Sequence, residues 1–227
     1  MPISTFSDIC NAYYINLDHR TDRDEHMNAE LLALGLKASR FSAIQLKNGA
    51  IGCTMSHLKL LQTALEQQLD HILIMEDDIT FLDPKLFKKQ FNTFIQNHGN
   101  NWDVILFGGN NVPPFNAIDS TCIKVSRCQT TTGYLVNRHY IPHMCKNIKD
   151  GLKLLIGNPE QHYFYAIDKY WFALQQSGRW FLIIPATIIQ YEGYSDIEKR
   201  NTNYANMMID PYKLQRRTHP KIDMKIS

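Results

Sequence analysis

The sequence predicts an α/β fold, with a mostly parallel sheet flanked by helices in a single domain that spans residues 1–227. Two observations predict it. Short apolar runs of strand length alternate along the chain with longer segments whose apolar residues recur at helical spacing. A chain of 227 residues is also of a size at which one domain can bury roughly 70% of its unfolded surface.

The N-terminal third begins this alternation. Residues 12–17 (AYYINL) are typical of a buried strand, and residues 24–35 have helical spacing and end at a glycine that favours a helix stop. Residues 56–68 predict a second helix, whose expected buried face consists of Leu58, Leu61 and Leu65. Residues 71–75 (HILIM) form a continuous apolar run, as expected for a parallel strand buried on both faces.

The remaining elements continue the pattern. Asp83 and Pro84 predict the cap and first turn of a helix with an aromatic stripe. Strands are expected over residues 102–109 and 131–137. One helix is expected over residues 163–178 and ends at Gly178. Two further strands, residues 180–184 and 187–190, are expected to close the sheet. A polar C-terminal tail begins at about residue 198.

Composition excludes several classes of protein. The formal net charge of +2 argues against nucleic-acid binding through many phosphate contacts. Five cysteines without a CxxC pair favour reduced core residues over a disulfide or zinc framework. No signal peptide is visible, and the longest apolar run is about half the length of a bilayer span. We therefore expect a cytoplasmic protein with no membrane span, and a bacterial or viral origin is plausible.

Three adjacent carboxylates, Glu76, Asp77 and Asp78, follow the apolar run directly. In an extended strand end Glu76 and Asp78 point one way and Asp77 the other. The carboxyl end of a parallel strand is where open α/β sheets bind ligands, and such oxygens suit Mg²⁺ or Mn²⁺. The alternative is a helix cap, but Asp83 already supplies one.

Two metal-dependent chemistries fit an acidic strand end. In a phosphatase of the haloacid dehalogenase type, Glu76, Asp78 and Thr80 have the required spacing, but the first of them is the wrong acid for the nucleophile. In transfer from a nucleotide diphosphate sugar, a metal bridges the diphosphate and stabilises the leaving group.

Polar groups elsewhere favour the second chemistry. Asn16, Asp18, Arg20 and Arg23 follow the first strand, where they can meet a nucleotide. The stretch NGAIGCTMSH, residues 48–57, places two glycines ahead of a helix whose N-terminus can bind an anion or sugar hydroxyls.

Four motifs in order, INLDHRTDR, GAIGCTMSHLKLLQ, ILIMEDDI and IIQYEGYSDIE, resemble those of glycosyltransferase family 25. This family includes bacterial lipooligosaccharide (lipopolysaccharide biosynthesis) galactosyltransferases and collagen hydroxylysine galactosyltransferases. The resemblance implies a GT-A type (Rossmann-like) fold, a UDP-glucose or UDP-galactose donor, and inversion at the anomeric carbon.

The resemblance also implies roles for individual residues. Asp78 is the expected first metal ligand and Glu76 the second, and Asp77 is expected to hold ribose or sugar hydroxyls. The implied contacts to the nucleotide sugar come from Asn16, Leu17, Arg20, Arg23, Ser56 and His57. Two positions depart from the family pattern: His19 replaces a common basic residue, and Ala50 a common glutamate.

Inverting transfer needs a base that takes the proton of the acceptor hydroxyl. Asp168 in YAIDKYW is the expected base, because the family has an aspartate in a similar block; a surface aspartate paired with Lys169 is the alternative. Asp196 is the second candidate, and the alternatives for it are that it orders the nucleotide loop or approaches the metal.

The expected function is therefore a Mn²⁺- or Mg²⁺-dependent inverting hexosyltransferase. It moves glucose or galactose from a UDP-sugar to a hydroxyl of a glycan or of a protein side chain such as hydroxylysine. Two alternatives remain open at this point, a catalytically silent nucleotide-sugar-binding module and the phosphatase.

Overall fold

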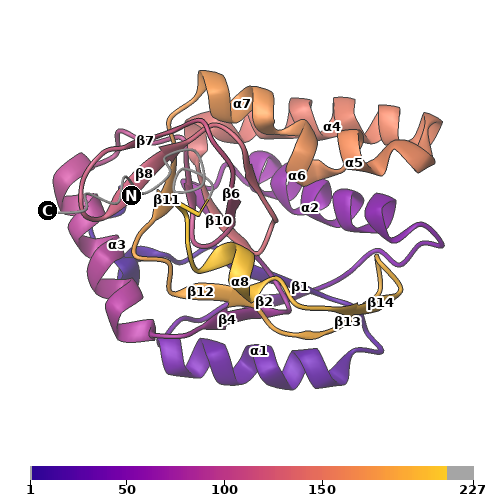
Figure 1. Ribbon diagram of the computed structural model, residues 1–227, viewed down its shortest axis with the longest axis horizontal. Helices are drawn as coiled ribbons and strands as arrows, with labels where there is room; N and C mark the ends of the chain where they lie inside the picture. The colour runs from indigo at the N-terminus through magenta and orange to yellow at the C-terminus, as the bar shows by residue number, and fades with distance from the viewer. Residues whose placement is uncertain (1, 214–227) are drawn as a thin grey trace, which may run out of the picture.

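The computed structural model describes residues 2–213 and is built on one eight-stranded sheet with helices on both faces (Figure 1). Six of the eight strands run in the same direction, and β10 and β8 run against them. In order across the sheet the strands are β2 (Ser39–Ser42), β1 (Ala12–Asn16), β3 (His71–Glu76), β10 (Gly133–Asn137), β5 (Val104–Leu106), β11 (Trp180–Ile183), β8 (Cys122–Val125) and β7 (Phe115–Ala117). The predicted fold class, a mostly parallel sheet flanked by helices, is confirmed.

Three small two-stranded sheets accompany the central one. They pair β4 (Ile79–Phe81) with β12 (Ile188–Gln190), β13 (Gly193–Ser195) with β14 (Arg200–Thr202), and β6 (Asn110–Asn111) with β9 (Cys128–Gln129). The prediction that residues 187–190 close the central sheet is therefore wrong. The chain leaves that sheet before Pro185, which has no N–H for a ladder, and then pairs with the strand that follows the acidic triplet.

Four long helices carry most of the packing. They are α1 (Thr21–Leu34), α2 (Gly49–Glu66), α3 (Pro84–His98) and α4 (Ile141–Gly157). The shorter helices are α5 (His162–Tyr165), α6 (Ile167–Tyr170), α7 (Phe172–Ser177) and α8 (Ala205–Met208), with 3₁₀ turns at Phe6–Asp8, Arg138–Tyr140 and Pro159–Gln161.

The single helix expected over residues 163–178 is wrong, because this segment forms three short helices. Ala166, between α5 and α6, has an extended backbone with ψ of 148°, which breaks the helical hydrogen bonding. The predicted end is confirmed, since Gly178 follows the last residue of α7.

The sheet separates two apolar cores. One face packs against α1 and α3, with Met27 and Phe91 fully buried, and the other against α2 and α4, with Leu61 and Met144 fully buried. Figure 1 shows α1 on one side of the sheet and α2 with α4 on the other. The strands between them are apolar on both faces, as residues 71–75 predict.

Local signals at the helix ends are confirmed in two places. Gly35 follows α1 with a φ of +68°, a left-handed conformation that favours glycine. The Asp83 side chain accepts a hydrogen bond from Leu86 N and caps α3, so the acidic triplet is not needed as its cap. The expected burial of Leu65 is wrong, because α2 turns Leu61 and Ala64 inward and leaves Leu65 exposed.

All five cysteines are free, but only Cys122 and Cys128 are buried, so the expectation that most of them are core residues is wrong. Among the described residues, no helix has the length and apolar character required to cross a membrane.

Candidate active site

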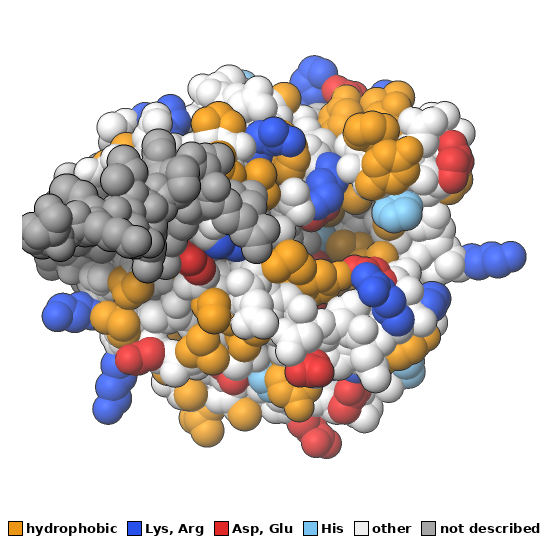
Figure 2. Space-filling model, in the orientation of Figure 1, with side chains coloured by type: hydrophobic (Ala, Val, Ile, Leu, Met, Phe, Trp, Pro, Cys, Tyr) orange, Lys and Arg blue, Asp and Glu red, His pale blue; other side chains and the backbone are white. Residues whose placement is uncertain are grey.

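A cavity of about 990 Å³ lies at the carboxyl ends of β1 and β3. Its walls come from the N-terminal turn of α2, from residues 129–131, from α6, and from residues 195–199 near the end of the described chain. Figure 2 shows the face on which it opens, a hollow right of centre bordered by basic, acidic and apolar side chains. The volume is that of a site for a sizeable small molecule.

The acidic triplet lies at the bottom of this cavity. Glu76 is the last residue of β3, while Asp77 and Asp78 form the turn into β4, so the expected extended strand end is wrong. Gln190 Nε2 lies 3.0 Å from Glu76 Oε2 and 3.5 Å from Asp78 Oδ1. Asp77 instead accepts from Arg23 and Asn16. The turn thus places Glu76 and Asp78 on one side and Asp77 on the other.

Arg23 is the main counterion of the turn. Its Nη1 lies 2.7 Å from Asp77 Oδ1 and 3.3 Å from Asp78 Oδ2. Burial nevertheless raises the pKa of Asp78 to about 7, and the charge of Glu76 contributes to the rise. Burial also raises the pKa of Asp77 above its ordinary value. A single guanidinium therefore does not compensate these carboxylates.

Glu76 has better local compensation. Thr131 Oγ1 donates to its Oε1 at 2.6 Å, and the buried His57 places Nε2 3.7 Å from the same oxygen. Burial alone would raise the pKa of Glu76, but His57 and Thr131 outweigh it and hold that pKa below the ordinary value. The other ring nitrogen of His57 lies 2.8 Å from the Tyr134 hydroxyl. Glu76 is therefore the carboxylate of the triplet that stays ionised most readily.

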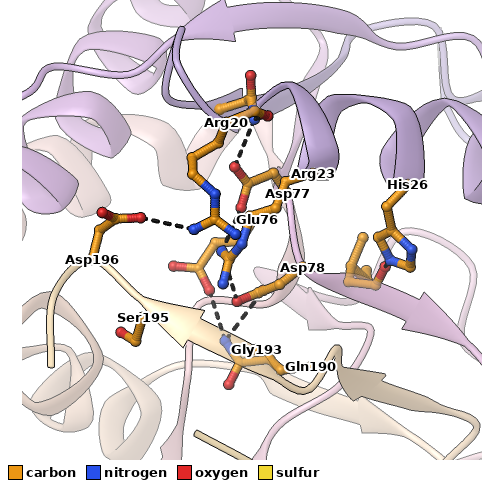
Figure 3. Close-up of polar contacts among 12 residues, drawn as sticks. Arg20, Arg23, His26, Glu76, Asp77, Asp78, Gln190, Gly193, Ser195 and Asp196 are labelled. Atoms are coloured by element: carbon orange, nitrogen blue, oxygen red, sulfur yellow. Dashed lines mark hydrogen bonds and ion pairs between the residues drawn. The ribbon is translucent and has the colours of Figure 1, made fainter. Parts of the chain in front are cut away.

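A second arginine, Arg20, links the loop after β1 to residues 194–196. Arg20 Nη1 donates to Asp196 Oδ2 at 2.8 Å and to the Tyr194 carbonyl at 3.1 Å, and its other nitrogens pair with Asp22. Arg23 Nη2 donates to the same Tyr194 carbonyl. Figure 3 shows both guanidinium groups lying between the acidic turn and this C-terminal segment. Arg20 and Arg23 therefore hold residues 194–196 over the cavity.

Asn16 and Ser56, both expected to contact the nucleotide sugar, are committed to the protein itself. Asn16 is buried, does not line the cavity, and donates from Nδ2 to Asp77 and to the Arg20 carbonyl. Ser56 Oγ donates to the Gly52 carbonyl and accepts from Ile44 N. These two side chains position the walls of the site.

Ser56 nevertheless lines the cavity, and so do the other residues expected to contact the nucleotide sugar. They are Leu17, Arg20, Arg23, His57 and Asp77. The two glycines expected ahead of the helix instead lie inside α2, which begins at Gly49 after the cap Asn48. This extension brings the first turn of α2 to the cavity wall.

Asp168 lies in the first turn of α6 and lines the same cavity. Its Oδ2 accepts from Thr130 N at 3.1 Å and lies 3.2 Å from Lys169 Nζ. The pairing with Lys169 considered from the sequence is therefore present, and the carboxylate still faces the cavity.

Three residues of the site carried no signal that the sequence analysis used, namely Thr131, Tyr134 and Gln190. All three contact the triplet or His57. Thr131 belongs to a threonine run directly before β10, and Gln190 is the polar residue that ends an apolar run. Polar residues at these strand boundaries could have indicated both.

The charge of the acidic turn fits a divalent cation. Three carboxylates meet one guanidinium, that of Arg23, so two negative charges are left when all three are ionised. The hydrogen bonds to the two oxygens of Glu76 are 2.6 Å and 3.0 Å long, whereas those to the two oxygens of Asp78 are 3.3 Å and 3.5 Å, so Asp78 is the less compensated. The donor set consists of oxygens, which Mg²⁺ and Mn²⁺ prefer. Asp78 therefore fits a metal ligand better than Glu76 does.

Residues 45–154 match the sequence model described as glycosyltransferase family 25 (LPS biosynthesis protein). These residues belong to glycosyltransferase family 25. The match confirms the family that the motifs predict, and it confirms the enzyme class, a glycosyltransferase. No curated protein matches the sequence.

The family 25 segment contains His57 and the whole acidic triplet, while Arg20, Asp168 and Asp196 lie outside it.

This chain is similar to several solved structures. One of them is a glycosyltransferase involved in glycosylation of the major capsid of PBCV-1. It is 14% identical with a TM-score of 0.48, and the alignment covers 83% of this chain and 95% of that one.

Two further structures are similar to this chain. For the mannose-1-phosphate geranyltransferase of Thermus thermophilus the identity is 10% and the TM-score 0.40, with 75% of this chain and 58% of that chain covered. For a mutant Drosophila β-1,4-galactosyltransferase 7 in complex with manganese, UDP-Gal and xylobiose, the identity is 16% and the TM-score 0.32. That alignment covers 59% of this chain and 50% of the other.

Proposed function

We propose that this family 25 glycosyltransferase transfers glucose or galactose from a UDP-sugar to a hydroxyl group, with inversion and with a divalent cation, Mn²⁺ or Mg²⁺. The described residues act as one glycosyltransferase domain. The observation that carries the proposal is the uncompensated charge of the acidic turn at the bottom of a cavity large enough for a nucleotide sugar. A cation and a diphosphate together would neutralise that turn and the arginines beside it.

Asp78 would hold the cation, with Glu76 as its second ligand. When bound, the cation would supply positive charge that stabilises the negative charge developing on the leaving group. Arg20 and Arg23 line the same cavity and are placed to face the phosphates. The first turn of α2 adds the N-terminal end of an 18-residue helix, which favours an anion.

Asp168 would act as the general base. The acceptor oxygen forms a bond to the anomeric carbon while the bond from that carbon to the phosphate oxygen breaks. UDP leaves with the electron pair, and the acceptor proton passes to Asp168. In this assignment the acceptor enters beside α5, where His162 and the exposed Tyr163 line the mouth of the cavity.

The acceptor is a hydroxyl of a glycan or of a protein side chain such as hydroxylysine. The phosphatase alternative is less favoured, because Thr80 would have to join Glu76 and Asp78 in the site. The Thr80 hydroxyl instead lies 3.1 Å from His26 Nε2, and Thr80 does not line the cavity.

The test is Mn²⁺-dependent release of UDP from UDP-glucose, UDP-galactose and other nucleotide sugars, by the wild type and by Asp78→Asn. Asp150→Asn is the matched control, because Asp150 pairs with Lys146 on the outside of α4, away from the cavity. Hydrolysis of one donor that chelator and Asp78→Asn abolish, and that Asp150→Asn retains, would support the transferase.

Two other outcomes separate the rivals. Metal-dependent UDP binding without hydrolysis or transfer to any offered glycan or peptide hydroxyl would favour the silent binding module. Cleavage of simple phosphate esters without a nucleotide would favour the phosphatase.

A further inference from the structure

A second cluster of side chains of the kinds that bind metals lies outside the cavity. His98, Asp119 and Cys122 place one nitrogen, one carboxylate oxygen and one sulfur within 4.8 Å of one another. None of the three residues lines the cavity described above.

Three separate positions of the fold bring these atoms together. His98 is the last residue of α3, Asp119 lies in the turn between β7 and β8, and Cys122 is the first residue of β8. Asp119 Oδ1 accepts from the backbone N–H groups of Thr121 and Cys122, which fixes the carboxylate. Its second oxygen is thereby directed toward His98 Nε2, 3.0 Å away.

The His98 ring is held in place by aromatic neighbours. Its centroid lies 4.7 Å from that of Phe94 and 5.8 Å from that of Phe181. Nε2 therefore faces Asp119 Oδ2 and, at 3.7 Å, Cys122 Sγ. One ring nitrogen cannot donate a proton to the carboxylate and accept one from the thiol at the same time. Hydrogen bonding from this nitrogen can therefore account for its contact with Asp119 or for its contact with Cys122, but not for both.

The distances suit a tetrahedral ion. With Zn–N and Zn–O bonds of about 2.1 Å and a Zn–S bond of about 2.3 Å, tetrahedral angles separate N from O by about 3.4 Å and N from S by about 3.6 Å. The observed separations are 3.0 Å and 3.7 Å. Both separations therefore lie within a few tenths of an ångström of the tetrahedral values.

The charge and the type of the donor atoms indicate which ion the three residues would bind. A divalent cation with one carboxylate, one thiolate and a neutral imidazole forms a neutral unit, which suits a partly buried place. Sulfur and imidazole ligands favour Zn²⁺ over the hard cations Mg²⁺ and Mn²⁺. Cys122 is fully buried, while His98 and Asp119 keep part of their side chains exposed, so an ion can enter from their side.

We infer that His98, Asp119 and Cys122 bind one zinc ion, with the fourth position open to water. The ion would tie the C-terminal end of α3 to the turn between β7 and β8, so its role would be structural and independent of sugar transfer.

The test uses the metal-free protein and Co²⁺ as a spectroscopic probe, because a thiolate ligand gives a sulfur-to-cobalt charge-transfer band that oxygen ligands do not. The variants are Cys122→Ser and His98→Gln. Cys53→Ser is the discriminating control, because Cys53 lies with His57 and Glu76 in the other group of this kind, at the cavity. Cys145→Ser controls for loss of a thiol elsewhere, on α4.

The expected result is one Co²⁺ per chain with a charge-transfer band, displaced by one equivalent of Zn²⁺. The band persists in Cys53→Ser and Cys145→Ser and is lost in Cys122→Ser. His98→Gln changes a less buried position. Its affinity for Zn²⁺ is expected to fall by more than the roughly 10–100-fold that loss of an outer-shell partner costs.

The inference is overturned by a wild type that shows no thiolate band. It is also overturned by a band that Cys53→Ser removes, or by unchanged Zn²⁺ affinity in His98→Gln. If Cys122→Ser does not fold, the His98→Gln and Cys53→Ser results still decide between the two groups.

Discussion

Arg20 Nη1 lies 2.8 Å from Asp196 Oδ2, and this contact joins the loop after β1 to the segment between β13 and β14. Asp196 and Asp168 both line the cavity, but Asp196 pairs with an arginine, whereas Asp168 contacts Thr130 N and Lys169. The two candidate bases therefore have different surroundings.

We expect Asp168→Asn to lower kcat by about 10²–10⁴-fold with little change in the donor KM, because the variant lacks the base but keeps the shape. Asp196→Asn is expected to affect mainly the donor KM and to speed amide hydrogen exchange in 193–202, because it weakens the contact to Arg20. Steady-state kinetics and exchange mass spectrometry of both variants provide the measurements. If Asp196→Asn lowered kcat more than Asp168→Asn does, Asp196 would be the base and Asp168 would not.

Asp78→Asn is expected to stabilise the metal-free protein above pH 7. The folded-state pKa of about 7 exceeds the ordinary value of 3.8, so the folded state holds the proton more tightly. The stabilising contribution of Asp78 is therefore complete below about pH 4 and is lost as the pH rises through 7. The asparagine variant lacks this loss and should be more stable than wild type by about 1–3 kcal/mol at pH 8.

Chemical unfolding of both proteins in chelator between pH 4 and pH 8 measures this difference, and parallel stability curves would contradict it. Added Mn²⁺ should raise the Tm of the wild type and leave that of Asp78→Asn unchanged.

Gly52→Ala is expected to unfold or strongly destabilise the protein. A Cβ at Gly52 would lie closer to the Ile44 carbonyl oxygen than van der Waals contact allows, and that oxygen belongs to backbone which cannot move independently of the loop before α2. Gly157, at the end of α4, has nothing within 4 Å of such a Cβ. Gly157→Ala should therefore be neutral or stabilising by up to about 1 kcal/mol. Urea unfolding of the pair tests the opposite signs.

Thr131→Val is expected to cost about 1.5–3 kcal/mol of stability. The substitution keeps the shape but removes the hydroxyl that donates to the ionised, partly buried Glu76. The control is Thr93→Val, where the hydroxyl donates to a carbonyl of its own helix, with an expected change within about 0.5 kcal/mol. Equal losses in the two variants would mean that Glu76 does not depend on Thr131.

The sequence predicted those features whose causes are local. The apolar run of β3, the stop at Gly35 and the cap at Asp83 each depend on residues a few positions apart. The triplet could be placed at a strand end for the same reason. The need for glycine at position 52 was beyond such reasoning, because it arises from packing against Ile44.

The rest depends on contacts between distant residues. Gln190 lies 114 positions from Glu76, and no local pattern indicates that β12 pairs with β4 instead of joining the central sheet. The extended backbone at Ala166 interrupts a segment with uninterrupted helical character in the sequence. Likewise, Asn16 and Ser56 have side chains suited to ligand contacts, and only the structure gives their partners as protein groups.

The pairing of β12 with β4 has a consequence for synthesis of the protein on the ribosome. Gln190 reaches both carboxylates on one side of the acidic turn, and Tyr191 N donates to the Asp78 carbonyl at 2.6 Å. A nascent chain that has emerged only as far as β11 therefore has the motif but cannot yet assemble its surroundings. Competence to bind a donor would thus arise late in translation, after most of the central sheet has formed.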